Sequence, residues 1–155
     1  MTPEDVKALV IEVLNEPVTL KFKKLIEQAT TPVRKNSTDS CFDVYATSKS
    51  IEGNYIEYGT GVSLVIPEGY EVKLFARSSI SNTGMVLANS VGVIDETYRL
   101  DLMVRFKSVY PYAGQPYNIG DRIAQIQLVK RVPTVLEEVT EVSQTGRGGF
   151  GSTGR

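Results

Sequence analysis

Residues 92–99, Gly-Val-Ile-Asp-Glu-Thr-Tyr-Arg, place one acidic side chain between an apolar run and an aromatic ring. For Asp95 the ordinary role in such a place is that of a turn residue. If the segment is a rigid hairpin, Asp95 can instead accept a proton from water, with Tyr98 forming a pocket wall. The segment therefore predicts either a turn or a general base.

Two other segments carry groups that bind phosphate oxygens. Residues 77–79 read Arg-Ser-Ser and open a predicted helical turn over residues 78–83, so hydroxyls and free amides can face an oxyanion. Residues 120–125, Gly-Asp-Arg-Ile-Ala-Gln, lead from a turn into a strand. Serine pairs are also common helix caps, and a salt bridge can mark a strand start. Each segment alone is compatible with either interpretation.

The C-terminal segment, residues 143–155, has one large apolar residue, Phe150, among glycines, hydroxyls and two arginines. Such a segment cannot build a core and is predicted to be flexible, as in a frayed terminus. The same composition also suits a wrap around a phosphorylated, ring-bearing ligand. Backbone amides meet oxygens, arginine supplies charge and phenylalanine stacks on a ring.

These segments are embedded in an all-β pattern. Residues 1–16 predict a helical extension, with Thr2 as the cap and Pro3 in the first turn. Short alternating runs separated by turn signals then predict a β-sandwich or barrel domain over residues 17–142, followed by the tail at 143–155. The clearest runs are Val18–Phe22, Asp43–Ala46, Ile51–Glu57, Gly61–Ile66, Tyr70–Phe75, Leu100–Phe106 and Arg122–Val129.

Composition narrows the chemistry. The 155 residues carry a net charge of −1, which gives no footprint for nucleic acid or an anionic membrane. Histidine is absent and Cys41 is the single cysteine, so histidine-based nucleophile systems, His-ligated metal sites, a Cys₄ zinc site and an intrachain disulfide are excluded. A base must then be Asp, Glu, Lys or Tyr, and any metal a hard cation bound through oxygen. We expect a cytoplasmic protein, of a bacterium or of a phage-infected host.

Five short motifs in order resemble the signature of the trimeric dUTPase family. The resemblance covers about residues 18–155, and an Asn-Ser-Val triplet precedes the third motif much as in the family. The motifs are Asp39–Ala46, Arg77–Ser79, Gly92–Arg99, Gly120–Gln125 and Gly148–Gly154.

The resemblance implies a distorted jelly-roll β-barrel, a homotrimer with active sites at subunit junctions, and Mg²⁺-dependent hydrolysis of dUTP to dUMP and pyrophosphate. That reaction limits uracil in DNA and supplies dUMP for dTMP synthesis. By the same resemblance, Asp95 is the base that activates water for attack on the α-phosphorus. Tyr98 packs against the deoxyribose, where a 2′-hydroxyl would collide with it. The uracil edge is read by Asn89 and by the backbone of Gly92, Val93 and Ile94.

The remaining implied roles concern the phosphates. The phosphate chain is held by Arg77, Ser78, Ser79 and Gln125. The tail adds stacking of Phe150 on uracil and γ-phosphate contacts from Gly151, Ser152, Thr153 and either Arg147 or Arg155. Supporting roles fall to Asp43, Asp121 and Arg122. Mg²⁺ is held by phosphates and water, with no direct protein ligand.

Two alternatives stay open at this point. The related dCTP deaminases place a catalytic glutamate on the strand after the third motif, where this chain has Arg105. A regulatory module that binds dUTP and docks a protein partner, with the N-terminal helix as a docking element, is the second alternative. We expect the helix to dock on the trimer surface.

Overall fold

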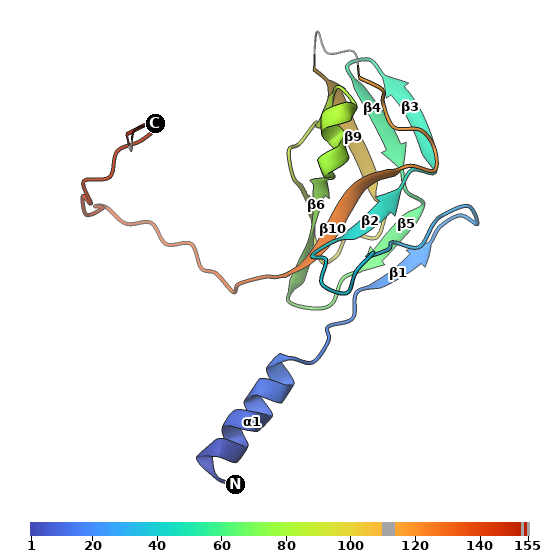
Figure 1. Cartoon of the computed structure of the whole chain (residues 1–155). Coiled ribbons are helices and arrows are strands. Elements are labelled where there is room, and N and C mark those ends of the chain that lie inside the picture. The colour runs from blue at the N-terminus through green and yellow to red at the C-terminus, as the bar shows by residue number, and fades with distance from the viewer. Residues whose placement is uncertain (110–113, 153, 155) are drawn as a thin grey trace.

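The computed structural model describes residues 1–109, 114–152 and 154 of the chain (Figure 1). Helix α1 (Pro3–Leu14) begins with a capping box, in which the Thr2 hydroxyl accepts a hydrogen bond from the Asp5 amide at 3.1 Å and the Asp5 carboxylate accepts one from the Thr2 amide at 2.6 Å. The predicted N-terminal helix is therefore confirmed. No helix in these ranges has the length and apolar character needed to cross a membrane.

The described residues form ten strands, and every strand pair is antiparallel. A single 3-10 turn, η1 (Ser78–Asn82), matches the predicted helical turn. The strands are β1 (Lys21–Lys24), β2 (Phe42–Tyr45), β3 (Ser48–Glu52), β4 (Tyr55–Gly59), β5 (Val62–Val65), β6 (Tyr70–Ala76), β7 (Met85–Leu87), β8 (Gly92–Ile94), β9 (Met103–Ser108) and β10 (Arg122–Lys130).

Two four-stranded sheets, ordered β2-β10-β6-β8 and β3-β4-β9-β7, make up most of the body, and β1 and β5 form a third, two-stranded sheet (Figure 1). Buried and exposed residues alternate in β9, which packs one face against the core, whereas β1 and β3 are exposed along their whole length. The all-β class is confirmed, although the sheets stay open and do not close into a continuous barrel.

An aromatic cluster lies in the core. The Tyr58 and Phe106 rings pack edge to face with centroids 5.6 Å apart, and both side chains are fully buried. The Tyr58 hydroxyl donates a 2.8 Å hydrogen bond to the Tyr117 carbonyl oxygen. Burial, with smaller contributions from Asp121 and Tyr117, raises the pKa of Tyr58 to about 12, so this donor keeps its proton.

Four local predictions differ from the structure. The strand expected over Val18–Phe22 is β1, which begins three residues later, at Lys21. Residues 51–57, expected as one strand, belong to the β3–β4 hairpin, because Gly53 adopts a left-handed φ of +57° and turns the chain. The last strand before the long loop starts at Met103, three residues later than expected. Residues 89–98 are not a two-stranded hairpin; they hold the single strand β8, which pairs with β6.

Candidate active site

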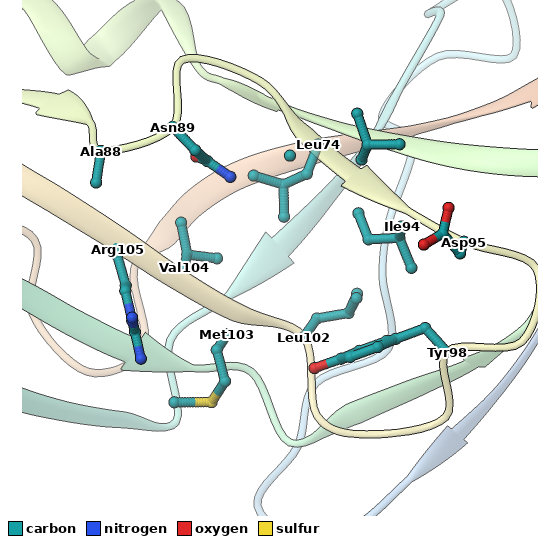
Figure 2. A pocket seen from close by; sticks show the side chains of 12 residues that line it. Leu74, Ala88, Asn89, Ile94, Asp95, Tyr98, Leu102, Met103, Val104 and Arg105 are labelled. Atoms are coloured by element: carbon teal, nitrogen blue, oxygen red, sulfur yellow. The ribbon is translucent and has the colours of Figure 1, made fainter.

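A cavity of about 540 Å³ lies beside β8, with apolar side chains as its floor and polar groups at its ends. Asn89 lies at one end, whereas Asp95 and Tyr98 lie at the other (Figure 2). The lining residues come from β6, from β9 and from the segment around β8, so the cavity sits where the two larger sheets meet. We call this cavity the base pocket, after the nucleobase that the family resemblance implies. Its lining includes six residues singled out from the sequence: Asn89, Gly92, Val93, Ile94, Asp95 and Tyr98.

The backbone of β8 has one edge available for a ligand. In the described residues β8 is the last strand of its sheet, paired with β6 on one side only. A Cβ atom on Gly92 would lie 3.1 Å from the Leu74 Cβ atom, so glycine lets β8 pack tightly there. The preceding turn holds Ser90 in a left-handed conformation, φ 62°, which is uncommon outside glycine and is often found at functional sites. A planar base can therefore meet amide and carbonyl groups along this edge.

Asp95 directly follows β8 and is exposed. Its backbone carbonyl accepts a 3.0 Å hydrogen bond from the Tyr98 amide, which forms the turn. Its carboxylate makes no hydrogen bond or ion pair with any other described residue, so both oxygens can accept hydrogen bonds from water.

The Tyr98 ring is held in place by Asp101. The Tyr98 hydroxyl donates to the Asp101 carbonyl oxygen at 2.8 Å, and the Asp101 carboxylate in turn accepts from the Thr60 hydroxyl at 3.1 Å and the Val62 amide at 3.2 Å. Burial, and then Asp101, raises the pKa of Tyr98, so the phenol remains a donor. A ring fixed in this way makes a rigid pocket wall.

A second cavity, of about 520 Å³, shares no lining residue with the base pocket. We call it the phosphate pocket because its lining combines arginines, hydroxyls and an amide. The predicted residues it contains are Asp43, Arg77, Ser78, Arg122 and Gln125. Ser79 contacts Arg77 from behind, and Asp121 lies in the adjoining turn, where its carboxylate accepts from the Asn118 amide at 2.7 Å.

Arg77 is anchored through two of the three nitrogens of its guanidinium group. Its Nε donates to Asp43 Oδ1 at 2.9 Å, while one terminal nitrogen donates to Ser79 Oγ at 3.3 Å and to the Arg122 carbonyl oxygen at 3.2 Å. A guanidinium has five N–H donors, so these bonds leave the two on the other terminal nitrogen. No described residue accepts from them, and they can bind an oxyanion.

Neighbouring strands place the other groups of the phosphate pocket. Gln125 on β10 lies opposite Asp43 on β2, and its amide nitrogen donates to the Ala76 carbonyl oxygen at 2.9 Å. The second Asp43 oxygen accepts from Arg122 at 3.3 Å, so this carboxylate is shared by two arginines. Burial, and then Asp43, raises the pKa of the Cys41 thiol, which keeps it protonated and weakly nucleophilic.

Asp95 and Arg77 lie at opposite ends of β6. Val72 pairs with Ile94, so the next position along places Asp95 opposite Glu71, while Arg77 follows the far end of the strand. The six residue steps from position 71 to position 77, at about 3.3 Å each, separate Asp95 from Arg77 by roughly 20 Å. Within one chain these two side chains cannot act on the same phosphorus atom.

The C-terminal segment extends away from the body (Figure 1). Its only large ring, Phe150, is fully exposed, and the last turns are closed by hydrogen bonds from Ser152 to Gly149 and from Gly154 to Gly151. The predicted residues Arg147, Phe150, Gly151 and Ser152 therefore line neither pocket. Thr153 and Arg155 lie outside the described residues.

The donor set bears on metal binding. Across the described ranges, no three Asp, Glu or Cys side chains are grouped to hold an ion. Mg²⁺ prefers oxygen ligands and commonly binds through substrate phosphates and water. The phosphate pocket offers Arg77, Ser78 and Gln125 for phosphate oxygens, and a magnesium ion bound to such phosphates needs no protein ligand.

Arg105 occupies the position at which a deaminase would need its glutamate. Its Nε pairs with a Glu57 carboxylate oxygen at 2.6 Å, and its guanidinium carbon lies 4.7 Å from the centroid of the Tyr55 ring. A permanently charged group cannot act as a general base. The sequence indicated no role for Asp101 or Tyr117, because their side chains bond to residues 38 to 41 positions away in the chain.

Comparison with known proteins matches the family model of dUTPases to residues 27–154. The deoxyuridine 5′-triphosphate nucleotidohydrolase of Finegoldia magna is 37% identical over 144 residues, covering 84% of this chain and 97% of the relative. Among solved structures, the Staphylococcus bacteriophage 80alpha dUTPase with dUpNHpp has a TM-score of 0.72 and 28% identity over 88% of this chain and 99% of that one. Its description concerns phage dUTPases that control transfer of virulence genes by a G protein-like mechanism. A mutant dUTPase of phage phi11 of S. aureus, described with a structural Mg(II) ion, has a TM-score of 0.67 and 26% identity, covering 80% and 98%.

Proposed function

The chain belongs to the dUTPase family, with its jelly-roll fold, and is a dUTP diphosphatase; we propose that Asp95 activates the attacking water. The oxygen of this water attacks the α-phosphorus, the bond to the β-phosphate bridging oxygen breaks, and dUMP and pyrophosphate leave. The proton of the water passes to Asp95. The observation that carries this mechanism is the unengaged Asp95 carboxylate at the end of a pocket shaped for a base and a sugar.

Selectivity for dUTP follows from the shape of the base pocket. The backbone edge of β8 and the Asn89 amide can pair with the polar edge of uracil. We assign the Tyr98 ring to the deoxyribose, because a ring fixed by Asp101 cannot move aside for a 2′-hydroxyl. Buried polar groups that are satisfied by one base reject another strongly.

The phosphates are held by a second subunit in this proposal. The separation of roughly 20 Å between Asp95 and Arg77 argues for a site that combines the base pocket of one chain with the phosphate pocket of another. Exposed apolar side chains on the extension after β10 also favour subunit contacts, since they have little to pack against in their own chain. They are Val132, Val135, Leu136, Val139 and Val142. A homotrimer satisfies both requirements.

The tail completes the site by closing over bound nucleotide. Phe150 stacks on uracil, and the segment around Ser152 and Thr153, with Arg147 or Arg155, binds the γ-phosphate. Closure excludes bulk water and strengthens the electrostatic contacts. Mg²⁺, held by the phosphates and water, would neutralise charge on the triphosphate; Arg77, Ser78, Ser79 and Gln125 orient it.

The products place the enzyme in nucleotide metabolism, where removal of dUTP limits uracil in DNA and dUMP feeds dTMP synthesis. Cys41 is a free thiol. This suits a reducing cytoplasm, bacterial or of an infected host, as the proposed location.

Pyrophosphate release tests this function. With Mg²⁺ present, we expect kcat/KM for dUTP to exceed the values for dTTP, UTP and dCTP by at least about 100-fold. Chelation of Mg²⁺ by EDTA should remove most of the activity, and added Mg²⁺ should restore it. Deamination of dCTP, or equal turnover of UTP and dUTP, would contradict the proposed reading of the base pocket.

Helix α1 favours a second role for the chain, in which it regulates a partner protein by docking to it. None of its residues is buried, it projects from the body, and Leu9, Val10 and Val13 expose an apolar surface (Figure 1). The helix is not docked on its own chain. We expect deletion of residues 1–16 to leave kcat/KM within about 2-fold and to abolish capture of a partner in pull-downs with dUpNHpp. A large loss of turnover would argue that α1 belongs to the catalytic assembly, and absence of capture by the full chain would argue against regulation.

A further inference from the structure

Tyr117 lies between β9 and β10, three residues before Gly120, and is 7% exposed. Its ring packs against the two buried rings of the core, with centroids 6.5 Å from Tyr58 and 5.7 Å from Phe106. Its carbonyl oxygen accepts hydrogen bonds from the Tyr58 hydroxyl at 2.8 Å and from Lys49 Nζ at 2.9 Å. Ring and backbone are thus both fixed, which fixes the position of the hydroxyl group.

That hydroxyl group reaches out of the core toward the phosphate pocket. It shares a 3.1 Å hydrogen bond with Ser79 Oγ, which also accepts from Arg77 at 3.3 Å. The same terminal nitrogen of Arg77 donates to the Arg122 carbonyl oxygen. Residues 117–122 therefore support Arg77 at two points, once through Ser79 and once directly.

We propose that Tyr117 is a positioning residue for phosphate binding, which acts through Ser79 to hold the free terminal nitrogen of Arg77 toward the phosphates of dUTP. Without the Tyr117 hydroxyl, the Ser79 side chain is free to leave the rotamer that accepts from Arg77. One of the three anchors of the guanidinium group is then lost, and small displacements of positioning groups are costly in rate. This inference rests on the proposed role of Arg77.

Tyr117→Phe removes one oxygen atom and keeps the ring and the carbonyl acceptor. We expect a roughly 3–10-fold fall in kcat/KM for dUTP, the scale of one hydrogen bond, carried mainly by a higher KM. Tyr70→Phe is the matched control, because the Tyr70 hydroxyl makes no hydrogen bond within the described residues; it should behave as the wild type. Equal kinetics for the two variants would overturn the proposal.

A double-mutant cycle separates positioning from general structure. If Tyr117 acts only through Ser79, then Ser79→Ala combined with Tyr117→Phe should lose no more activity than Ser79→Ala alone. Losses that multiply, or a fall in kcat matched by a fall in melting temperature, would show that Tyr117 is merely structural. Arg77→Gln tests the role of Arg77 separately from that of Tyr117. Full activity in that variant would reject the assignment of Arg77 to the phosphates. A disabled Arg77→Gln beside an unaffected Tyr117→Phe would reject only the role of Tyr117.

Discussion

Asp95→Asn is expected to lower kcat for dUTP by about 10²–10⁴-fold, the range for a general base, while binding of dUpNHpp stays largely intact. Asparagine keeps the shape of the side chain but cannot take a proton from water. The Asp95 carboxylate makes no hydrogen bond or ion pair within the described part of the chain, so its replacement should leave the fold undisturbed. Pyrophosphate release and calorimetric titration with the analogue measure the two effects separately.

The neighbouring acid supplies a matched control. The Glu96 carboxylate accepts a hydrogen bond from the Gly69 amide at 3.0 Å and pairs with Arg131 at 3.0 Å, so it is structurally engaged where Asp95 is not. Glu96→Gln keeps an acceptor and should retain most of the turnover. A greater loss of kcat in Glu96→Gln than in Asp95→Asn would show that the base has been misassigned.

The same variant reports on the shared site. If each site takes Asp95 from one subunit and Arg77 from another, random co-assembly of Asp95→Asn with Arg77→Gln leaves about a quarter of all sites wild type, half times half, which is one site in each mixed trimer. Each variant alone is impaired at every site. Activity recovered only in the mixture would support the junction, whereas no recovery in verified mixed trimers would place both groups in one subunit.

Local sequence patterns predicted the helix and most strands, because capping, alternation and turn chemistry are short-range effects. Asp95 was placed after an apolar run, and it does follow β8. The pattern could not show that β8 pairs with β6, so that Asp95 and Arg77 lie at opposite ends of one strand. Strand pairing depends on contacts between residues far apart in the chain. The number of residues between two motifs therefore does not give their distance in space.

Supporting residues were harder to predict for the same reason. The Asp101 carboxylate bonds to Thr60 and the Tyr117 hydroxyl bonds to Ser79, 41 and 38 positions away in the chain. Neither interaction leaves a pattern in the local sequence. At residues 51–57 the local pattern itself was misleading. The strand-like composition continues across Gly53, although the chain turns there.

Removal of residues 144–155 is expected to lower kcat/KM for dUTP by at least about 100-fold, while the melting temperature changes little. Stacking on a base is worth about 1–3 kcal/mol and charged hydrogen bonds to phosphate contribute further, so loss of both is large. Residues 144–152 and 154 line neither pocket, and Phe150, the only large ring of the segment, is fully exposed, so removal uncovers almost no core. Steady-state kinetics and thermal unfolding of the shortened chain provide the two measurements.

Point variants separate the stacking contact from the rest of the tail. Phe150→Ala should account for part of the loss, about 10-fold or more, and Phe150→Trp should restore most of it because a larger ring still stacks. Activity that returns with any bulky apolar side chain, such as leucine, would indicate simple burial. A parallel fall in melting temperature and activity on truncation would show that the tail stabilises the assembly and does not close over nucleotide.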